Sequence, residues 1–229
     1  MKHLNVINMI KILLITRCSR LDFLEKISEN IIKLAKKFNT GKFVWCVAFD
    51  TNRITIADIN RKWLDEMLKC NEIEFQYMYS SSDDNRYGSN IANDALFKFK
   101  NRFDITHVYL LDDDNALHEM FDELCRHLYE DDEHITLFNQ LRLNKKDGNI
   151  LLVGVDYTIS PENVVGWVDS AQFVIPFKVL IEHNGYEDGY CIDGLTIKKL
   201  LKNGVTYKCI KSTAALYNYF TELESVYHY

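Results

Sequence analysis

The sequence predicts an α/β fold, in which a mostly parallel β-sheet carries helices on both faces and the C-terminal half is mixed β. Three observations support this class. Strand-like and helix-like segments alternate up to about residue 134, which is typical of parallel sheets. Polar or acidic residues end the first, second and fourth strand-like segments. Beyond residue 134, short strand-like segments accompany only one further helical pattern.

The first two predicted strands flank a helix. Apolar runs at 10–15 and 43–49 predict the strands. Asp22 and Glu25 form a capping-box pattern at the start of the helix between them. The apolar positions of this helix recur at helical spacing: Phe23, Ile27, Ile31, Leu34 and Phe38.

Two further strand–helix units follow. A helix is predicted at 61–70, and alternating apolar residues at 73–79 predict the third strand. Ser89 is placed to cap the next helix. The apolar run 107–111 predicts the fourth strand. A helix after it is predicted from four apolar positions at helical spacing: Leu117, Phe121, Leu124 and Leu128.

The C-terminal half contains weaker signals. Residues 135–143 and 149–155 flank a turn-like segment and predict a hairpin. Residues 164–168 and 173–176 are strand-like. A last helix is predicted at 191–201, ended by Asn203 and Gly204, and a last strand at 205–210.

Composition excludes several classes of protein. The net charge is −6 and no block of basic residues is longer than a short pair, so nucleic acid is not expected as a partner. The six cysteines show no Cys-x-x-Cys spacing, which favours reduced cysteines in a cytoplasmic protein. Lys11 interrupts the N-terminal apolar run, which we interpret as a strand and not as a signal peptide. No transmembrane segment is expected, because no run approaches the ~20 apolar residues of a span.

Three consecutive carboxylates, Asp112, Asp113 and Asp114, end the fourth predicted strand. Unit charges a few ångströms apart repel by about 1 kcal/mol even in water, and by more where water is scarce. A bound cation would offset this repulsion, and hard oxygen ligands suit Mg²⁺ or Mn²⁺, which also bind phosphate. The alternative is a solvated acidic turn.

Polar residues at three strand ends are expected to meet at one edge of the sheet. Residues 16–20 follow the first strand, Asp50 follows the second, and the acidic triplet follows the fourth. Ligands of open parallel sheets bind at the carboxyl ends of the strands. The sequence therefore places a candidate site at this edge.

These residues resemble a known family. Asn93-Asp94-Ala95-Leu96, then a strand leading into Asp112-Asp113-Asp114-Asn115, resembles the core of metal-dependent nucleotide-sugar glycosyltransferases of the GT-A fold (the DXD motif). The layout is most similar to that of the inverting glucuronyltransferases, whose acidic motif also reads Asp-Asp-Asp-Asn. The stretches at 16–17, Asp50 and 186–200 agree in order, so the resemblance spans about residues 10–202.

The resemblance implies roles for the acidic residues. Asp114 would be the direct ligand of Mn²⁺ or Mg²⁺, with Asp112 as a further candidate ligand. Asp112 and Asp113 would contact ribose or donor-sugar hydroxyls, unless they are only supporting or solvated carboxylates. Asp50 would accept the ring N–H of uracil, unless it is an ordinary loop aspartate.

Further donor-binding candidates lie on the first turn and two loops. Thr16 belongs to the turn that matches the family, and Arg17, Arg20 and Arg86 can reach the base or a phosphate. The alternative for the arginines is a place on the surface or in a mobile loop. Two more candidates, beside the aromatic residues Trp167 and Phe173, are expected at the sugar: Asp169 and Gln172.

An inverting transfer needs a base, and Asp193 stands where the family has its catalytic carboxylate. The family has glutamate there, and an aspartate also suits a helix N-cap. Glu187 and Asp188 are the fallback candidates. Because no membrane anchor is expected, a bacterial or viral polysaccharide enzyme fits better than a Golgi enzyme.

The sequence thus predicts one domain over residues 1–229, with a nucleotide-binding half at about 1–134 and an acceptor-side half at about 135–229. The expected function is metal-dependent and inverting transfer of a sugar, from a UDP-sugar to a glycan or polysaccharide acceptor. Two alternatives remain open. One is a sugar nucleotidyltransferase, although residues 16–20 lack the glycine- and lysine-rich loop of that class. The other is a sugar-nucleotide-binding module without catalysis.

Overall fold

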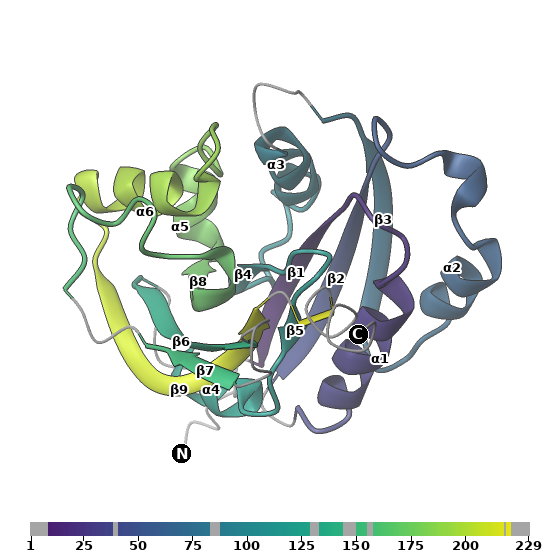
Figure 1. Cartoon of the computed structure of the whole chain (residues 1–229), viewed down its shortest axis with the longest axis horizontal. Coiled ribbons are helices and arrows are strands. Elements are labelled where there is room, and N and C mark those ends of the chain that lie inside the picture. Colours follow the sequence, from purple (N-terminus) through teal and green to yellow (C-terminus); the bar gives the residue numbers. More distant parts are fainter. Residues whose placement is uncertain are drawn as a thin grey trace, which may run out of the picture.

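The strands in the described part of the chain join in one nine-stranded sheet (Figure 1). The structure is a computed structural model that describes residues 9–38, 41–82, 88–128, 133–143, 150–154, 158–217 and 219–220. The strand order is β3-β2-β1-β4-β8-β6-β9-β5, and β7 pairs with β6 beside this path.

The N-terminal part of the sheet is parallel, as predicted. It consists of β1 (Ile10–Cys18), β2 (Gly41–Asp50), β3 (Glu74–Ser80) and β4 (His107–Leu110). The pairs β1–β2, β2–β3 and β1–β4 are all parallel. Alternate residues of β1 enter different hydrophobic clusters, so both faces are buried. A strand buried on both faces needs a nearly continuous apolar run, which explains the sequence signal.

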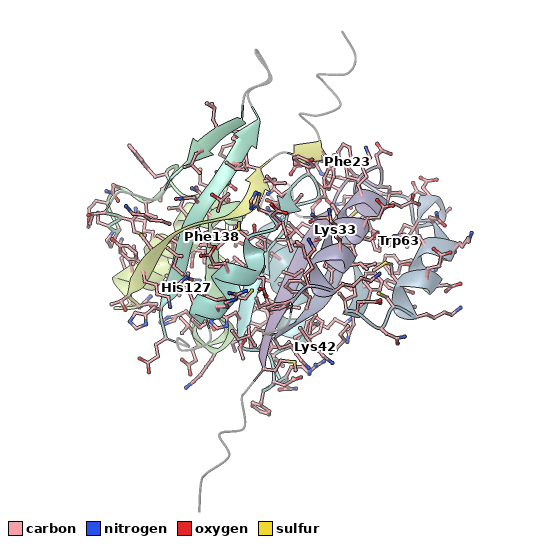
Figure 2. All side chains as sticks on the ribbon, turned by 90° about the horizontal axis from the view of Figure 1, so that it is seen from below. Phe23, Lys33, Lys42, Trp63, His127 and Phe138 are labelled. Atoms are coloured by element: carbon pink, nitrogen blue, oxygen red, sulfur yellow. The ribbon has the colours of Figure 1, made fainter. Side chains whose placement is uncertain are left out.

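Helices cover both faces of the sheet, which confirms the predicted class. Residues of α1 (Leu24–Ala35), α2 (Arg61–Leu68) and α4 (Phe121–Leu128) share one cluster with β1 and β2. Trp63 and Phe138 lie toward opposite sides of this layer (Figure 2). The other cluster contains residues from the remaining helices: α3 (Ser89–Lys98), α5 (Phe177–Glu182) and α6 (Ile192–Lys202).

The C-terminal part of the sheet is mixed, also as predicted. Its strands are β5 (Ala116–Leu117), β6 (Ile135–Leu143), β7 (Ile150–Val153), β8 (Phe173–Pro176) and β9 (Tyr207–Tyr217). β6 pairs antiparallel with β7 and β8 but parallel with β9, the long curved strand in yellow in Figure 1. β8 pairs antiparallel with β4 and so joins the two halves. The turn of the predicted hairpin lies outside the described residues.

The region after the acidic triplet differs from the prediction. Leu117 was expected in a helix but lies in β5, which pairs with β9. Asn30 of α1 explains the difference, because its side chain bonds both the N–H and the carbonyl of Leu117. This side-chain pairing holds the backbone extended, and α4 begins only at Phe121.

Both predicted helix caps are wrong. The N-cap of α1 is Phe23 and makes no side-chain cap bond, while Glu25 instead accepts a hydrogen bond from Asn60. The N-cap of α3 is Gly88 in the left-handed region, and the Ser89 hydroxyl donates to Asp188. In both cases a side chain of the predicted cap, Glu25 or Ser89, instead forms a hydrogen bond with a residue distant in the sequence.

Three other segments depart from expectation. Residues 164–168 were expected to be a strand but form turns with local backbone hydrogen bonds such as Trp167 to Val164. Helix α5 was not predicted, and β9 runs seven residues past Ile210, the predicted end. A short 3₁₀ turn over Ser170–Gln172 precedes β8, and another covers Ile56–Asp58.

None of the helices described is both long and apolar enough to span a bilayer.

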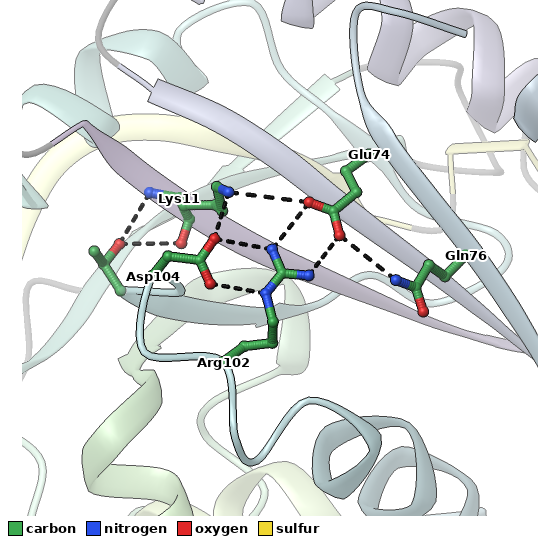
Figure 3. Close-up of polar contacts among 6 residues, drawn as sticks. Lys11, Glu74, Gln76, Arg102 and Asp104 are labelled. Carbon is green, nitrogen blue, oxygen red and sulfur yellow. Dashed lines mark hydrogen bonds and ion pairs between the residues drawn. The ribbon is translucent and has the colours of Figure 1, made fainter. Parts of the chain in front are cut away.

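An ion-pair network fixes the amino ends of the parallel strands (Figure 3). Arg102 binds Glu74 through both terminal nitrogens, at 2.6 and 3.0 Å, and its Nε donates to Asp104 at 2.8 Å. Lys11 of β1 also pairs with Asp104 at 2.5 Å. This network occupies the edge opposite the carboxyl ends, where ligands bind in open parallel sheets.

Candidate functional site

A pocket of about 780 Å³ opens at the carboxyl ends of β1, β2 and β4. Residues from β6, β7, β9 and the start of α6 close its other side. Most of the predicted site residues line it: Arg17, Arg20, Asp50, Asp112, Asp113, Asp114, Asp169, Gln172 and Asp193. The three strand ends thus meet, as their topology requires.

Asp112 is held between two elements of the fold. Its Oδ1 accepts hydrogen bonds from Arg17 at 2.5 and 3.0 Å, and its Oδ2 accepts one from the Ser170 hydroxyl at 2.8 Å. The end of β1 and the 3₁₀ turn before β8 are therefore linked through one carboxylate. Arg17 is itself only 17% exposed in its side chain.

Asp113 is 3% exposed, and its carboxylate accepts hydrogen bonds from the turn after β1. Its Oδ2 accepts from the Ser19 N–H at 2.7 Å, the Ser19 hydroxyl at 2.9 Å and the Arg20 N–H at 2.9 Å. Its Oδ1 pairs with the Arg20 guanidinium. These donors saturate both oxygens, so the expectation that Asp113 contacts ribose or a sugar hydroxyl does not fit the geometry. Asp113 instead positions Arg20.

Asp114 faces the pocket with one oxygen engaged. Its Oδ2 pairs with Arg20 at 2.9 Å. Burial raises the pKa of Asp114, and the charges of Asp112 and Asp113 raise it further, against the effect of Arg20. Burial raises the pKa of Asp169 to about 6, and the charges of Asp112 and Asp114 also contribute to this rise.

The repulsion among these carboxylates is the observation that bears on whether the pocket can bind a metal ion. In the described part of the chain, no group of three or more His, Cys, Asp or Glu side chains is arranged to hold a metal ion by itself. Mg²⁺, however, is usually held by one or two carboxylates together with substrate phosphates. The charge of Asp112 contributes to the raised pKa of both Asp114 and Asp169, and a divalent cation would relieve the same repulsion. The residues therefore fit an ion that binds together with a phosphate ligand.

Asp193 lines the pocket from the first turn of α6. Its Oδ1 is buried and has no hydrogen-bond partner among the residues described. Burial raises its pKa to about 7, the charge of Asp112 raises it as well, and Arg17 opposes the shift. The N-cap of α6 is Cys191, without a side-chain cap bond, so Asp193 is not the helix cap.

Gly194 explains how Asp193 reaches this place. A Cβ at Gly194 would lie 2.7 Å from the Cα of Val165 and 3.1 Å from the Val164 carbonyl oxygen. The first turn of α6 thus packs directly on the backbone of the 164–166 segment. This close contact fixes the position of Asp193, the residue that precedes Gly194.

The other predicted residues have varied surroundings. Thr16 is fully buried and accepts a hydrogen bond from the Trp45 indole at 2.9 Å, so its side chain belongs to the core and not to the pocket. Asp50 lines the pocket, with its Oδ1 accepting from the N–H groups of Asn52 and Ser82, both at 3.0 Å. Gln172 completes a capping box with Asp169. Arg86 lies outside the described residues.

The fallback bases are engaged elsewhere. Glu187 pairs with Lys199 at 2.9 Å, and Asp188 accepts a hydrogen bond from Ser89 at 2.5 Å. Neither residue lines the pocket. Asp193 is therefore the better placed of the three.

Several pocket residues were missed by sequence reasoning. Arg53 lies 3.5 Å from Asp50, Tyr190 is 81% exposed at the pocket, and Arg142 and Tyr217 come from β6 and β9. Trp167, which was expected beside Asp169 and Gln172, is 65% exposed and lines the pocket with them, so it was not missed. The alternation of Gln140 and Arg142 with Leu141 and Leu143 at the end of this strand was the available signal for the β6 wall.

The fold is shared with several solved structures, although no protein-family model and no curated protein matches the chain. TarS 1–349 of S. aureus in complex with UDP has a TM-score of 0.62 and 10% identity, covering 95% of this chain and 64% of that chain. Mannosyltransferase PcManGT of Pyrobaculum calidifontis, in complex with GDP-Man and Mn²⁺, has a TM-score of 0.57 and 11% identity, covering 89% and 54%.

A third similar structure is 4-diphosphocytidyl-2C-methyl-D-erythritol synthase of Anaerococcus prevotii, with a TM-score of 0.56, 10% identity and coverage of 96% of both chains. The chain spans 36% to 64% of the TarS chains that it matches. The architecture is therefore the Rossmann-like fold of GT-A glycosyltransferases and nucleotidyltransferases.

Proposed function

We propose that the chain is a glycosyltransferase that moves a sugar from a nucleoside diphosphate sugar, with UDP as the expected nucleotide, to a glycan or polysaccharide acceptor. The observation that carries this proposal is one pocket that combines arginine–aspartate pairs with an aspartate of raised pKa. Arg17 and Arg20 lie with Asp112 and Asp114 on one side, and Asp193 enters from α6. The similarity to UDP and GDP-Man complexes supports this assignment.

The donor would lie along the ends of β1, β2 and β4. Asp50 would bind the base, and the positive charges of Arg17 and Arg20, which line the same pocket, would attract the diphosphate. Asp114, with Asp112, would hold Mn²⁺ or Mg²⁺ against the diphosphate. When bound there, such an ion would supply Lewis-acid stabilisation of the diphosphate leaving group.

Asp193 would act as the general base of an inverting reaction. Its unpartnered Oδ1 can accept the hydrogen bond of an acceptor hydroxyl. The hydroxyl proton passes to Asp193, the acceptor oxygen bonds to the anomeric carbon, and the bond to the diphosphate breaks with its electron pair. A base with a pKa near the working pH suits this task, and the pKa of Asp193 is raised to about 7.

One alternative has its own support. The synthase from Anaerococcus prevotii matches over 96% of both chains, so a sugar nucleotidyltransferase fits the length of this chain. Products separate the two: a nucleotidyltransferase releases pyrophosphate from a nucleoside triphosphate and a sugar phosphate, whereas a glycosyltransferase releases a nucleoside diphosphate. The turn after β1 carries Arg17 and Arg20 bound to aspartates, and not a glycine-rich loop, which favours the glycosyltransferase.

A donor screen tests the proposal. The protein is incubated with UDP-glucose, UDP-galactose, UDP-glucuronate and GDP-mannose, each with Mn²⁺ and with EDTA. We expect slow, metal-dependent release of the nucleoside diphosphate from one donor. Release of pyrophosphate from UTP and a sugar phosphate would support the nucleotidyltransferase. Donor binding without turnover in any acceptor mixture would support a binding module.

The Asp193→Asn variant tests the base. We expect donor affinity within about twofold of the parent and a loss of transfer of at least about 100-fold, in the range typical of general-base removal. Asp188→Asn is the matched control, because Asp188 bonds Ser89 outside the pocket. Normal turnover by Asp193→Asn would remove this residue as the base.

A further inference from the structure

The β6 side of the pocket carries two polar residues that the proposed mechanism does not use. Gln140 and Arg142 line the pocket, whereas Leu141 between them lines a second hollow on the other face of the strand. This alternation is that of a β-strand. Opposite Arg142, the register places Leu151 of β7 and Tyr217 of β9 on the same face.

Arg142 is held by an aromatic ring and not by an acid. Its guanidinium lies 5.0 Å from the centroid of the Tyr217 ring. No carboxylate in the described part of the chain forms an ion pair with it, in contrast to Arg17 and Arg20, which are bound to aspartates. A stacked guanidinium keeps its N–H groups available in the plane, where they can bind an oxyanion in a bidentate manner.

Gln140 adds a buried acceptor beside this cation. The residue is 5% exposed, and its Oε1 has no hydrogen-bond partner among the residues described. Buried polar atoms are nearly always satisfied, so an unsatisfied one that lines a pocket indicates a missing ligand group. A carbonyl oxygen accepts hydrogen bonds, and a sugar hydroxyl supplies one.

We propose that Arg142 and Gln140 form a subsite for a hydroxylated anion on the acceptor, either a sugar acid or a sugar phosphate. Arg142 binds the carboxylate or phosphate, and Gln140 accepts a hydroxyl. The assignment to the acceptor rests on the proposed function. β6 is three strand positions from β1 in the sheet, about 14 Å at about 4.8 Å per strand, so Arg142 is remote from the arginines that face the diphosphate.

A titration followed by NMR tests the subsite without any donor. The Nε–Hε signal of Arg142, assigned from the Arg142→Gln variant, is followed during addition of D-glucuronate, glucose 6-phosphate or glucose at millimolar concentration. We expect one or both anions to shift the Arg142 signal while glucose does not. Arg61, an exposed residue at the start of α2, serves as the internal reference. The proposal is overturned if neither anion shifts the Arg142 signal, or if glucose shifts it by the same amount.

Kinetics then distinguish the possible sources of the anion. Acceptor oligosaccharides ending in glucose, glucuronate or a sugar phosphate are compared in the parent, Arg142→Gln, Arg142→Lys and Arg61→Gln proteins. We expect Arg142→Gln to raise KM at least about tenfold for one anionic acceptor and less than about twofold for the neutral one, as loss of one charge-assisted hydrogen bond predicts. Arg142→Lys should recover part of the loss, and Arg61→Gln should show none.

Donor binding separates this proposal from the proposed function. UDP affinity with Mn²⁺ should be unchanged in Arg142→Gln, and a loss of UDP affinity would place Arg142 at the diphosphate and overturn the acceptor assignment. If the parent protein binds no nucleotide sugar at all, the glycosyltransferase proposal fails. The NMR titration still decides whether the anion subsite exists.

Discussion

Asp113 and Asp193 line one pocket, and their surroundings suit them to different roles. Asp113 accepts hydrogen bonds from Ser19 and Arg20 through both oxygens, which ties the turn after β1 to the acidic triplet. Asp193 is half-buried, and its buried Oδ1 has no hydrogen-bond partner among the residues described, an environment that raises its pKa and favours its protonated form. We infer that the first residue holds the site together and that the second performs its chemistry.

The Asp113→Asn variant should lose stability. An amide places an NH₂ group against the donors of Ser19 and Arg20 and removes the charge, which we expect to cost about 3 kcal/mol in the free energy of unfolding. Urea denaturation in EDTA measures the loss. The matched control is Glu66→Gln, from an exposed pair with Lys62 at 3.8 Å, which should change stability by less than about 0.5 kcal/mol. Equal, small effects would contradict the role of Asp113.

Asp193 should make stability fall with rising pH. Its pKa of about 7 in the fold lies above the ordinary value of 3.8, so the folded state binds the proton more tightly than the unfolded state. The stability should therefore decline from about pH 4 to about pH 7 and then level off, by a few kcal/mol at most. In Asp193→Asn this decline should be smaller, so the variant should be more stable than the parent at pH 8.

Urea unfolding at pH 4.5 and at pH 8, without added metal, measures this difference. A variant that is less stable than the parent at pH 8 would show that the charged carboxylate stabilises the fold. A loss of activity in the same variant could then result from a less stable fold and not from the loss of the base.

Helix α6 shows how an element places a functional residue. Alanine usually stabilises a helix relative to glycine by up to about 1 kcal/mol. At Gly194 the sign should reverse, because a Cβ would lie 2.7 Å from the Val165 Cα, a backbone atom that cannot rotate away. We expect Gly194→Ala to lose about 1 to 3 kcal/mol of stability, in line with overpacking, and to move Asp193 in the pocket.

Thermal unfolding and donor hydrolysis measure both effects of Gly194→Ala. The control is an exposed glycine in the same part of the chain, Gly166, where a Cβ would meet no atom within 4 Å although its φ of +82° favours glycine. Gly166→Asn, a residue that tolerates this φ, should change stability by less than about 1 kcal/mol. Unchanged hydrolysis in Gly194→Ala would show that the contact does not position Asp193.

Elements with strong patterns were predictable, and those set by distant contacts were not. Apolar runs predicted the buried strands β1 to β4, and helical spacing of apolar residues predicted the helices α1, α2, α3 and α6. Both patterns were readable because they lie within a short stretch of sequence. Strand β5 depends on Asn30, 87 residues away, and the start of α3 depends on a left-handed glycine and on Asp188. Periodicity contains no information about such partners.

The same distinction holds for the pocket. Residues at the ends of adjacent parallel strands had to meet, so the acidic triplet, Arg17 and Asp50 were predictable. The β6 wall was not, because the order β4-β8-β6-β9 brings late segments beside early ones, and neither spacing nor composition fixes that order. Arg142 and Tyr217 therefore appeared only in the structure.

Across the whole molecule, the two edges of the parallel strands should behave independently. Arg102→Gln breaks the network with Glu74 and Asp104 at the amino ends, and we expect a loss of about 1 kcal/mol, since these groups are partly exposed. Donor binding, at the carboxyl ends, should be unchanged in calorimetry. A parallel loss of donor affinity would show that the pocket depends on this distant edge.

The measurement that tests the account most directly is calorimetric binding of UDP with and without Mn²⁺, in the parent protein and in Asp114→Ala. We expect Mn²⁺ to tighten UDP binding at least about tenfold in the parent, because an ion held by Asp114 would offset the negative charges of the carboxylates and of the diphosphate. In Asp114→Ala this gain should disappear. Equal UDP affinity with and without Mn²⁺ in the parent, or a full metal effect in Asp114→Ala, would contradict the account.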